Sequence, residues 1–272
     1  MKILLTGSNG SLGKRYRQMF PDVVPVSIRY GDSKMMVNLS DQIRTADTLI
    51  HASACLNPTD IESAIRDNAM LPLEILDMAG KINPMTHIIL ISTMSLLDET
   101  GQPRKMKDMT FYAASKYIME ELVPKIAKNP VTIVRFSSLF YEDPERDGLS
   151  KIIFTACRDN RIVASDCRRD FLPLWAACTW LNKLCCNQKW YNRTINLASG
   201  RSINMIDIAH YLVKKYGVSF HHTALPDYSG ICYKFNAEEA QSLEYIQFDL
   251  YKLIDQYYDK IRKELDVETA RY

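Results

Sequence analysis

Short apolar runs alternate with longer amphipathic segments through the first half of the chain. The apolar runs predict buried strands at 2–6, 23–28, 48–54, 87–93 and 131–136. Apolar positions at helical spacing predict helices at 12–20, at 111–127 and from Asp60 to about Met78. Near-continuous apolar strands that alternate with helices are typical of a parallel sheet with helices on both faces.

The pattern changes after about residue 140, where the segments become shorter and charged, aromatic and cysteine residues mix. We expect a strand at 194–200, a helix at 203–217 and a terminal helix at 246–264. The sequence therefore predicts a main α/β domain over 1–140 and a smaller lobe over 141–272. Some segments of the lobe, at about 168–200, are expected to return to the main sheet.

Composition adds limits to this picture. Of the 272 residues, 47% are apolar and 24% are charged, which is enough to build a sizeable core. The net charge of +2 neither indicates nor excludes an anionic ligand. The chain lacks the basic stripe with interleaved aromatic residues that marks nucleic-acid binding, so no nucleic-acid partner is expected.

The cysteines and the apolar runs indicate the compartment. The seven cysteines include no CxxC pair and no metal-ligand spacing, so we expect free thiols in a reducing compartment and no metal site. No apolar run reaches the roughly eighteen residues of a membrane span, and the N-terminal run MKILL is too short for a signal peptide. We therefore expect a cytoplasmic protein without a membrane segment.

Three of the ten glycines stand three residues apart in LLTGSNGSLGK at 4–14, directly after the first predicted strand. Gly7 would allow a tight turn, Gly10 would leave room for a pyrophosphate, and Gly13 would let the next helix pack closely on the strand. The N–H groups at the start of that helix favour a bound anion. A tight turn alone needs one glycine, so this strand–turn–helix context predicts a dinucleotide-binding domain with a Rossmann-type, doubly wound sheet over 1–140.

A second motif lies in the predicted helix 111–127, where residues 112–116 read YAASK, and the strand before it ends at Thr93. Residues four apart share one helix face, so the Lys116 ammonium is expected to lie beside the Tyr112 phenol. An ammonium can lower the pKa of a neighbouring phenol from its usual value of about 10 and help it exchange a proton with a substrate oxygen. The Thr93 hydroxyl would hydrogen-bond the same oxygen.

Together these motifs resemble the extended short-chain dehydrogenase/reductases, specifically the NAD-dependent epimerase/dehydratase family that modifies nucleotide sugars. The resemblance covers nearly the whole chain and implies that the lobe at 141–272 binds the substrate. It implies that the catalytic residues are Thr93, Tyr112 and Lys116. It implies cofactor contacts from Gly7, Asn9, Gly10, Ser11, Leu12, Gly13, Ala52, Ser53, Ala54, Asn68, Tyr112, Lys116, Phe136 and Ser138. It implies substrate contacts from Ser95, Ser138 and Arg169.

The tip of the second predicted strand bears on the choice of cofactor. A carboxylate there would bind the adenosine ribose of NAD, whereas an arginine would accommodate the 2′-phosphate of NADP. The tip carries Arg29 and no acid before Asp32, which favours NADP, although a solvated surface arginine would look the same and NAD stays open. By the same resemblance, Asn38 and Leu39 are expected to flank the adenine.

The residues after Thr93 bear on the reaction. Dehydratases of this family carry Asp-Glu there, but Met94 and Ser95 follow here, so water elimination lacks its acid–base pair. The compact chain resembles reductases, and we expect it to reduce the 4-keto group of a nucleotide-linked 4-keto-6-deoxysugar. A nucleotide-sugar 4-epimerase with tightly bound NAD and a non-catalytic dinucleotide-binding scaffold are the alternatives. By analogy with the family, a homodimer is expected through helices at 60–80 and 111–127.

Overall fold

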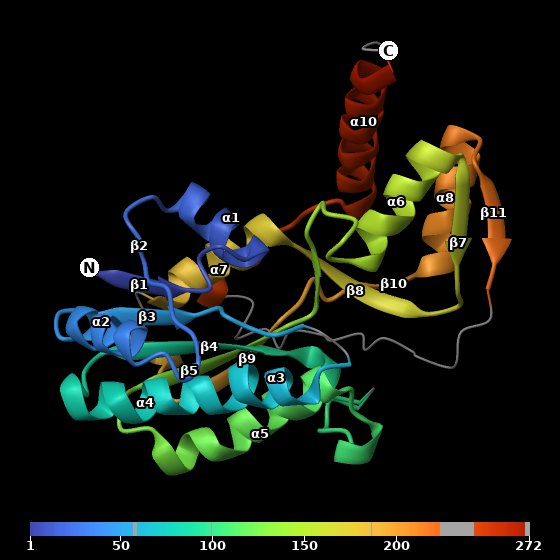
Figure 1. Ribbon diagram of the computed structural model, residues 1–272. Coiled ribbons are helices and arrows are strands. Elements are labelled where there is room, and N and C mark those ends of the chain that lie inside the picture. The colour runs from blue at the N-terminus through green and yellow to red at the C-terminus, as the bar shows by residue number, and fades with distance from the viewer. Residues whose placement is uncertain (57–58, 99, 186, 224–241, 270–272) are drawn as a thin grey trace. The chain divides into compact units, whose positions relative to one another are not determined.

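In the part of the chain that the computed structural model describes, five apolar runs of the first half and one of the second half form a six-stranded sheet (Figure 1). The strands follow the order β2-β1-β3-β4-β5-β9. They are β1 (Ile3–Thr6), β2 (Val24–Pro25), β3 (Thr48–His51), β4 (His87–Thr93), β5 (Val131–Phe136) and β9 (Arg193–Leu197). All neighbours pair in parallel, so the carboxyl ends of the strands share one edge of the sheet.

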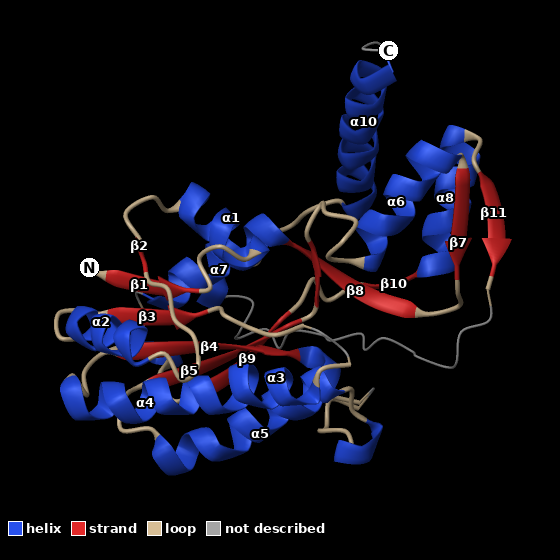
Figure 2. Cartoon of the chain, in the orientation of Figure 1, coloured by secondary structure: helices blue, strands red, loops and turns tan. Residues whose placement is uncertain are grey.

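Helices cover both faces of this sheet, as Figure 2 shows in blue beside the red strands. One face carries α1 (Ser11–Met19) and α7 (Leu174–Cys185). The other carries α2 (Ser33–Ile43), α4 (Leu71–Ile82) and α5 (Phe111–Ile126). The short helix α3 (Ile61–Ile65) and one π-helical turn, η1 (Arg66–Met70), lead into α4. The predicted doubly wound α/β fold is thereby confirmed.

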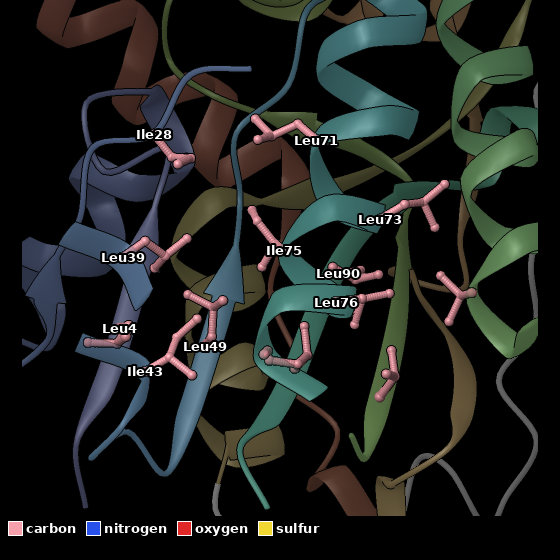
Figure 3. Close-up of a cluster of buried hydrophobic side chains, with 14 of the residues drawn as sticks. Leu4, Ile28, Leu39, Ile43, Leu49, Leu71, Leu73, Ile75, Leu76 and Leu90 are labelled. Atoms are coloured by element: carbon pink, nitrogen blue, oxygen red, sulfur yellow. The ribbon is translucent and has the colours of Figure 1, made fainter. Parts of the chain in front are cut away.

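The core of this unit lies between the sheet and the second set of helices (Figure 3). Leu4 of β1, Leu49 of β3 and Leu90 of β4 meet Leu39 of α2 and Leu76 of α4, and all five side chains are fully buried. Full burial of one leucine side chain contributes about 1.5–3 kcal/mol. This apolar layer therefore holds α2 and α4 against strands β1, β3 and β4.

The chain divides into two units, each with its own sheets and core. Unit 1 comprises Met1–Ser137 and Leu174–Leu197, and unit 2 comprises Ser138–Pro173 and Ala198–Tyr272. The structure describes residues 1–56, 59–98, 100–185, 187–223 and 242–269. None of the helices within these ranges has the length and apolar character needed to cross a lipid bilayer.

Within the residues that the structure describes, unit 2 combines two small sheets with helices α6, α8 and α10. A three-stranded sheet has the order β10-β8-β6, and a two-stranded parallel sheet pairs β11 with β7. The strands are β6 (Ser138–Phe140), β7 (Arg161–Ala164), β8 (Arg168–Pro173), β10 (Ser202–Asn204) and β11 (Ser219–His222). The helices are α6 (Gly148–Asp159), α8 (Met205–Tyr216) and α10 (Leu250–Thr269). Apolar side chains of all three helices, among them Ile153, Leu212 and Ile254, form its core.

The observed elements differ from the predicted ones mainly where tertiary contacts determine the ends of a strand or helix. The strand predicted at 23–28 is only two residues long, because Pro25 has no N–H and the chain leaves the sheet after Val26 donates to Leu5. The strand predicted to run to Ala54 ends at His51. The terminal helix begins at Leu250 and is displaced toward the C-terminus from 246–264. Helices α2, α6 and α7 were not predicted.

Candidate active site

The loop after β1 packs against the segment that follows β3. Gly7 has a φ of 68°, which lies in the left-handed region that glycine adopts readily. A Cβ atom at Gly7 would lie 2.5 Å from the carbonyl carbon of Ala52 and from the backbone nitrogen of Ser53. Both the turn and this close approach therefore require glycine at position 7.

The other two glycines of the motif have different surroundings. A Cβ atom at Gly13, inside α1, would lie 2.3 Å from the carbonyl oxygen of Gly7 and 2.7 Å from Cα of Ser8. A Cβ atom at Gly10 would meet only the Gly7 oxygen, at 3.3 Å. Gly10 is the N-cap of α1 and offers no side chain to the first N–H groups of the helix. Internal packing thus explains Gly7 and Gly13, while the space at Gly10 suits the approach of an anion.

Lys116 lies in α5 and has only 1% of its surface exposed. Burial lowers the pKa of its ammonium from 10.5 to about 8, and the nearby Glu120 carboxylate partly offsets this effect. Among the residues that the structure describes, this ammonium makes no hydrogen bond. A buried cation without a hydrogen bond is costly, so the position favours a polar ligand that offers oxygen atoms.

His51 lies beside this ammonium, at the carboxyl end of β3. Its Nδ1 atom is 2.8 Å from the Thr6 hydroxyl of β1, and its Nε2 atom is buried without a partner in the described part of the chain. Burial, and secondly the charge of Lys116, lower the pKa of His51 from 6.5 to about 3. The imidazole is therefore neutral near neutral pH, and the charge of Lys116 on α5 acts on a side chain at the end of β3.

Glu120 lies one helical turn beyond Lys116 and is also buried. Its carboxylate accepts hydrogen bonds from the Ser92 hydroxyl at 2.5 Å and from Nε of Arg135 at 3.0 Å. It also accepts a bond from the second guanidinium nitrogen of Arg135. Ser92 and Arg135 are paired in register across β4 and β5, so the sheet itself positions both donors.

Asn68 connects the segment after β3 to α5. Its side chain exchanges two 2.8 Å hydrogen bonds with the backbone of Cys55 and donates a third, of 3.1 Å, to the Ser115 hydroxyl. Asn68 lies fully buried in the π-helical turn η1, and such turns frequently occur at functional sites. The buried Asn68 side chain therefore joins the segment after β3 to helix α5, which carries Tyr112 and Lys116.

Thr93 and Ser95 stand where β4 ends and the short 3₁₀ helix η2 (Met94–Leu96) begins. The Thr93 hydroxyl oxygen accepts a bond from the Ser95 N–H at 3.1 Å and lies 2.9 Å from the Ser95 hydroxyl. Helix α5 packs on η2 and β4, and it carries the half-buried Tyr112 in its first turn. The structure thus places these three side chains on elements that are in direct contact (Figure 1).

Ser138 and Arg169, the predicted substrate contacts of unit 2, line one cavity of about 850 Å³ there. Three more basic residues line it, Arg146, Lys151 and Arg161. Its two carboxylates are engaged locally: Asp147 accepts bonds from Ser150, and Asp159 pairs with Arg158. The cavity therefore presents an excess of positive charge, which favours an anionic ligand.

Other predicted cofactor residues lie in varied places. Asn9 is exposed in the glycine loop, Ser11 is half-buried at the start of α1, and Ala54 follows the segment that Gly7 touches. Leu12 and Phe136 are buried at the starts or ends of their elements. In the described residues, no three His, Cys, Asp or Glu side chains gather as a metal site.

The residues expected near the adenosine lie in different surroundings. Arg29 is exposed after β2, and Asn38 is exposed on α2. Leu39 is fully buried in the core, because α2 turns this side chain toward β1 and β3 (Figure 3). The Leu39 side chain thus has no free surface to present to an adenine ring.

A family model described as the NAD dependent epimerase/dehydratase family matches residues 3–172, which is more than half of the chain. The chain belongs to this family. The predicted family and the predicted enzyme class are confirmed by this match. No curated protein sequence matches the chain.

Solved structures of similar fold cover 97% of this chain. MoeE5 in complex with UDP-glucuronic acid and NAD is 15% identical, with 100% of its chain covered and a TM-score of 0.81. UDP-glucuronic acid 4-epimerase from Bacillus cereus in complex with NAD is 18% identical, with 97% covered and a TM-score of 0.78. RMD from Pseudomonas aeruginosa complexed with NADPH is 14% identical, with 100% covered and a TM-score of 0.78. At such identities the likeness establishes the fold.

The sequence did not predict three polar residues that lie near Lys116 or bind its neighbour Glu120. His51, Glu120 and Arg135 were not singled out from the sequence. Glu120 could have been found from spacing, because it continues the face of Tyr112 and Lys116 by one more turn. Arg135 and His51 gave no such signal, since only the order of strands brings them to α5.

Proposed function

We propose that the chain is a nicotinamide-dinucleotide-dependent oxidoreductase that reduces the 4-keto group of a nucleotide-linked 4-keto-6-deoxysugar. The observation that carries this proposal is the buried Lys116 ammonium, one helical turn from Tyr112 and without a hydrogen bond among the described residues. Ribose hydroxyls would compensate such a cation, and family membership makes a nicotinamide dinucleotide the expected source of them.

The glycine loop fits the rest of such a cofactor. The space at Gly10 and the uncapped N–H groups of α1 suit a diphosphate, and the segment Ala52–Ala54 lies against the same loop. When bound, the nicotinamide supplies the hydride. The chain's own part is to hold the diphosphate at Gly10 and the ribose at Lys116.

Tyr112 would donate the proton that the reduced sugar oxygen needs. The hydroxyls of Thr93 and Ser95 lie 2.9 Å apart and would hydrogen-bond that oxygen from the end of β4. Lys116 would stabilise negative charge that develops on the phenol and the substrate, because its ammonium is buried where electrostatic interactions are strong. Residues of unit 1 would therefore position the substrate oxygen and supply its proton.

We propose NADP as the cofactor. In NAD-binding sites of this type a carboxylate after the second strand binds the ribose hydroxyls. Here the first acid after β2 is Asp32, and its carboxylate accepts a 3.0 Å bond from the Met35 N–H as the N-cap of α2. One oxygen of Asp32 is thus engaged within the chain, and the exposed Arg29 is a charged group of this segment that would accommodate a 2′-phosphate.

We propose that the cavity of unit 2 binds the nucleotide diphosphate of the substrate. Arg169 and Lys151 are among four basic residues on its wall, and the two carboxylates there are held by neighbours. Arginine can bind phosphate oxygens with two parallel hydrogen bonds. MoeE5 and the Bacillus cereus epimerase are named in complex with UDP sugars or NAD, which is consistent with a nucleotide-linked substrate for this relative.

A nucleotide-sugar 4-epimerase is the second candidate, because several structures of this fold are named as 4-epimerases. Epimerisation and ketone reduction both need only a Thr–Tyr–Lys set. Dehydration is disfavoured, since Met94 follows Thr93 and is buried, so no acid stands next to the substrate oxygen at that point. The two candidates differ in whether the cofactor is consumed.

Incubation of the purified protein with NADPH and a panel of nucleotide-linked 4-ketosugars tests the proposal. We expect stoichiometric NADPH oxidation, a loss of at least about a hundredfold in Tyr112→Phe, and unchanged rates in the matched control Tyr117→Phe. Interconversion of nucleotide sugars without net cofactor oxidation would favour the epimerase. No turnover with either substrate class would contradict both candidates.

We also propose a homodimer through α3, η1 and α5. Ile61, Met70 and Phe111 expose large apolar surfaces on these three elements, which pack on one another. Exposed apolar groups that gather on adjacent elements mark interaction surfaces. Light scattering should give twice the monomer mass, and a monomer at micromolar concentration would refute the dimer.

A further inference from the structure

The buried carboxylate of Glu120 does not pair with the buried ammonium of Lys116, although the spacing of four residues on one helix would allow that pair. The two residues are four apart on one face of α5, where opposite charges normally attract and meet. Glu120 instead forms an ion pair with Arg135, and among the described residues no ion pair within 4.0 Å joins it to Lys116. Both charges lie in a nearly dry environment, because Glu120 is 7% exposed and Lys116 is 1% exposed.

The hydrogen bonds of Glu120 explain this arrangement. Arg135 occupies both carboxylate oxygens, and the Ser92 hydroxyl takes a further bond to Oε1. A guanidinium that binds both oxygens of a carboxylate competes well against an ammonium, which offers a single point of charge. The register of β4 and β5 fixes both donors, so the carboxylate is held on the strand side.

We propose that Glu120 is a positioning residue whose carboxylate is held by Arg135 and Ser92, so that it keeps the Lys116 ammonium charged from a distance and leaves its hydrogen bonds free for the cofactor. This inference rests on the proposed role of Lys116 as a cofactor ligand. Without Glu120, burial would favour the neutral amine. Without Arg135, the carboxylate would turn to the ammonium and occupy it.

Within the described residues, Glu120 is the charged neighbour with a resolved effect on this ammonium. His51 of β3 is influenced by its charge but is neutral near neutral pH, and Tyr112 lies one turn before it on the same helix. The charged residues of η1, Arg66 and Asp67, pair with each other on the surface. Glu120 is the charged group that raises the pKa of Lys116 against the effect of burial.

Titration of Lys116 in wild type and in variants of its neighbours tests this arrangement. Side-chain NMR of isotope-labelled lysine would follow the ammonium, with its signal assigned by its loss in Lys116→Arg. Glu120→Gln should lower the titration midpoint by about one pH unit or more, because the compensating charge is lost. Arg135→Met should raise it by a similar amount, because Glu120 then pairs with Lys116. The exposed neighbour variant Glu121→Gln is the matched control and should leave the midpoint unchanged.

Milder variants keep the test decisive if Arg135→Met does not fold. Ser92→Ala removes one of the bonds to Glu120 and should raise the midpoint slightly, whereas Arg135→Lys should return it toward the wild-type value. Shifts of Glu120→Gln and of the Arg135 or Ser92 variants in the same direction, or no shift in any of them, would overturn the inference. A purely structural role would lower stability without these opposite shifts.

Calorimetric titration with NADPH separates this inference from the proposed function. Arg135→Met should bind NADPH at least about tenfold more weakly than wild type near neutral pH, because its ammonium is occupied. If wild type binds neither NADPH nor NADH, the proposed function fails, while the NMR shifts still decide the role of Glu120. If wild type binds the dinucleotide and the midpoints do not move oppositely, only the present inference fails.

Discussion

Replacing Gly13 with alanine adds one methyl group where the structure has no room, whereas the same change at Gly10 adds a methyl group that makes one tight contact. The new methyl carbon at position 13 would lie 2.3 Å from the Gly7 oxygen and 2.7 Å from Cα of Ser8. At position 10 the nearest atom, the same Gly7 oxygen, is 3.3 Å away. The pair therefore separates the packing role of a glycine from its role in binding.

The magnitudes follow from these distances. Alanine gains about 1 kcal/mol over glycine inside a helix, but backbone overlap at Gly13 costs about 3 kcal/mol, so Gly13→Ala should lose about 2 kcal/mol. For a unit of this size that corresponds to a melting temperature lower by about 4–8 °C. Gly10 has a φ of −73°, which alanine adopts freely, and loss of glycine at the N-cap costs about 0.5 kcal/mol.

Thermal unfolding and calorimetric titration with NADPH check both variants. Gly13→Ala should melt several degrees lower than Gly10→Ala. Gly10→Ala should keep near wild-type stability and bind NADPH at least about tenfold more weakly, because its methyl group occupies the space left for the diphosphate. Equal melting temperatures of the two variants, or full NADPH affinity in Gly10→Ala, would refute this reasoning.

Three further predictions concern buried polar groups. Lys116→Met should end activity yet stabilise the fold by roughly 3 kcal/mol near neutral pH, since no ammonium is then buried. Because the folded pKa of about 8 lies below the unfolded 10.5, the unfolded state holds more protons between these values, and denaturation midpoints should show the gain shrinking as pH rises through that range. His51 has a folded pKa of about 3 against 6.5 unfolded, so its contribution to the free energy of unfolding is complete above pH 6.5 and is lost as pH falls toward 3. Thermal melts of His51→Gln should therefore show a smaller loss of stability in acid than melts of wild type. An identical acid profile would contradict this. Asp170→Asn should destabilise unit 2 by about 1–3 kcal/mol in denaturant melts. The Asp170 carboxylate accepts hydrogen bonds from the N–H and the hydroxyl of Ser199 and from the Arg201 N–H, and the amide NH₂ of asparagine would face one of these donors. Wild-type stability of the variant would contradict this.

The parts of the fold that local pattern decides could be predicted from the sequence. The strands at 87–93 and 131–136 match β4 and β5 to the residue, because central parallel strands are continuous apolar runs. The helix predicted from Asp60 to Met78 is instead broken by the turn η1. There the buried side chain of Asn68 binds Cys55 and Ser115, and periodicity does not report such tertiary contacts.

The candidate site shows the same division. The spacing of Gly7, Gly10 and Gly13 was sufficient to predict the tight turn at Gly7 and the close packing at Gly13, since these glycines lie within one strand–turn–helix unit. The approach of a ligand to Gly10 stays a prediction. The link between Glu120 and Arg135 could not be predicted, because it depends on which strands are neighbours. The position of Leu39 was missed because α2 was not recognised as a helix.

The fate of the hydride tests the central claim most directly. Wild-type protein would be supplied with NADPH that carries deuterium at the transferable position, together with the nucleotide-linked 4-ketosugar that it turns over fastest. We expect deuterium at C4 of the product sugar from wild type and Tyr117→Phe, and at least about a hundredfold less from Tyr112→Phe. Product without deuterium, or equal incorporation by Tyr112→Phe, would contradict the assignment of Tyr112 and Lys116 to a ketoreductase site.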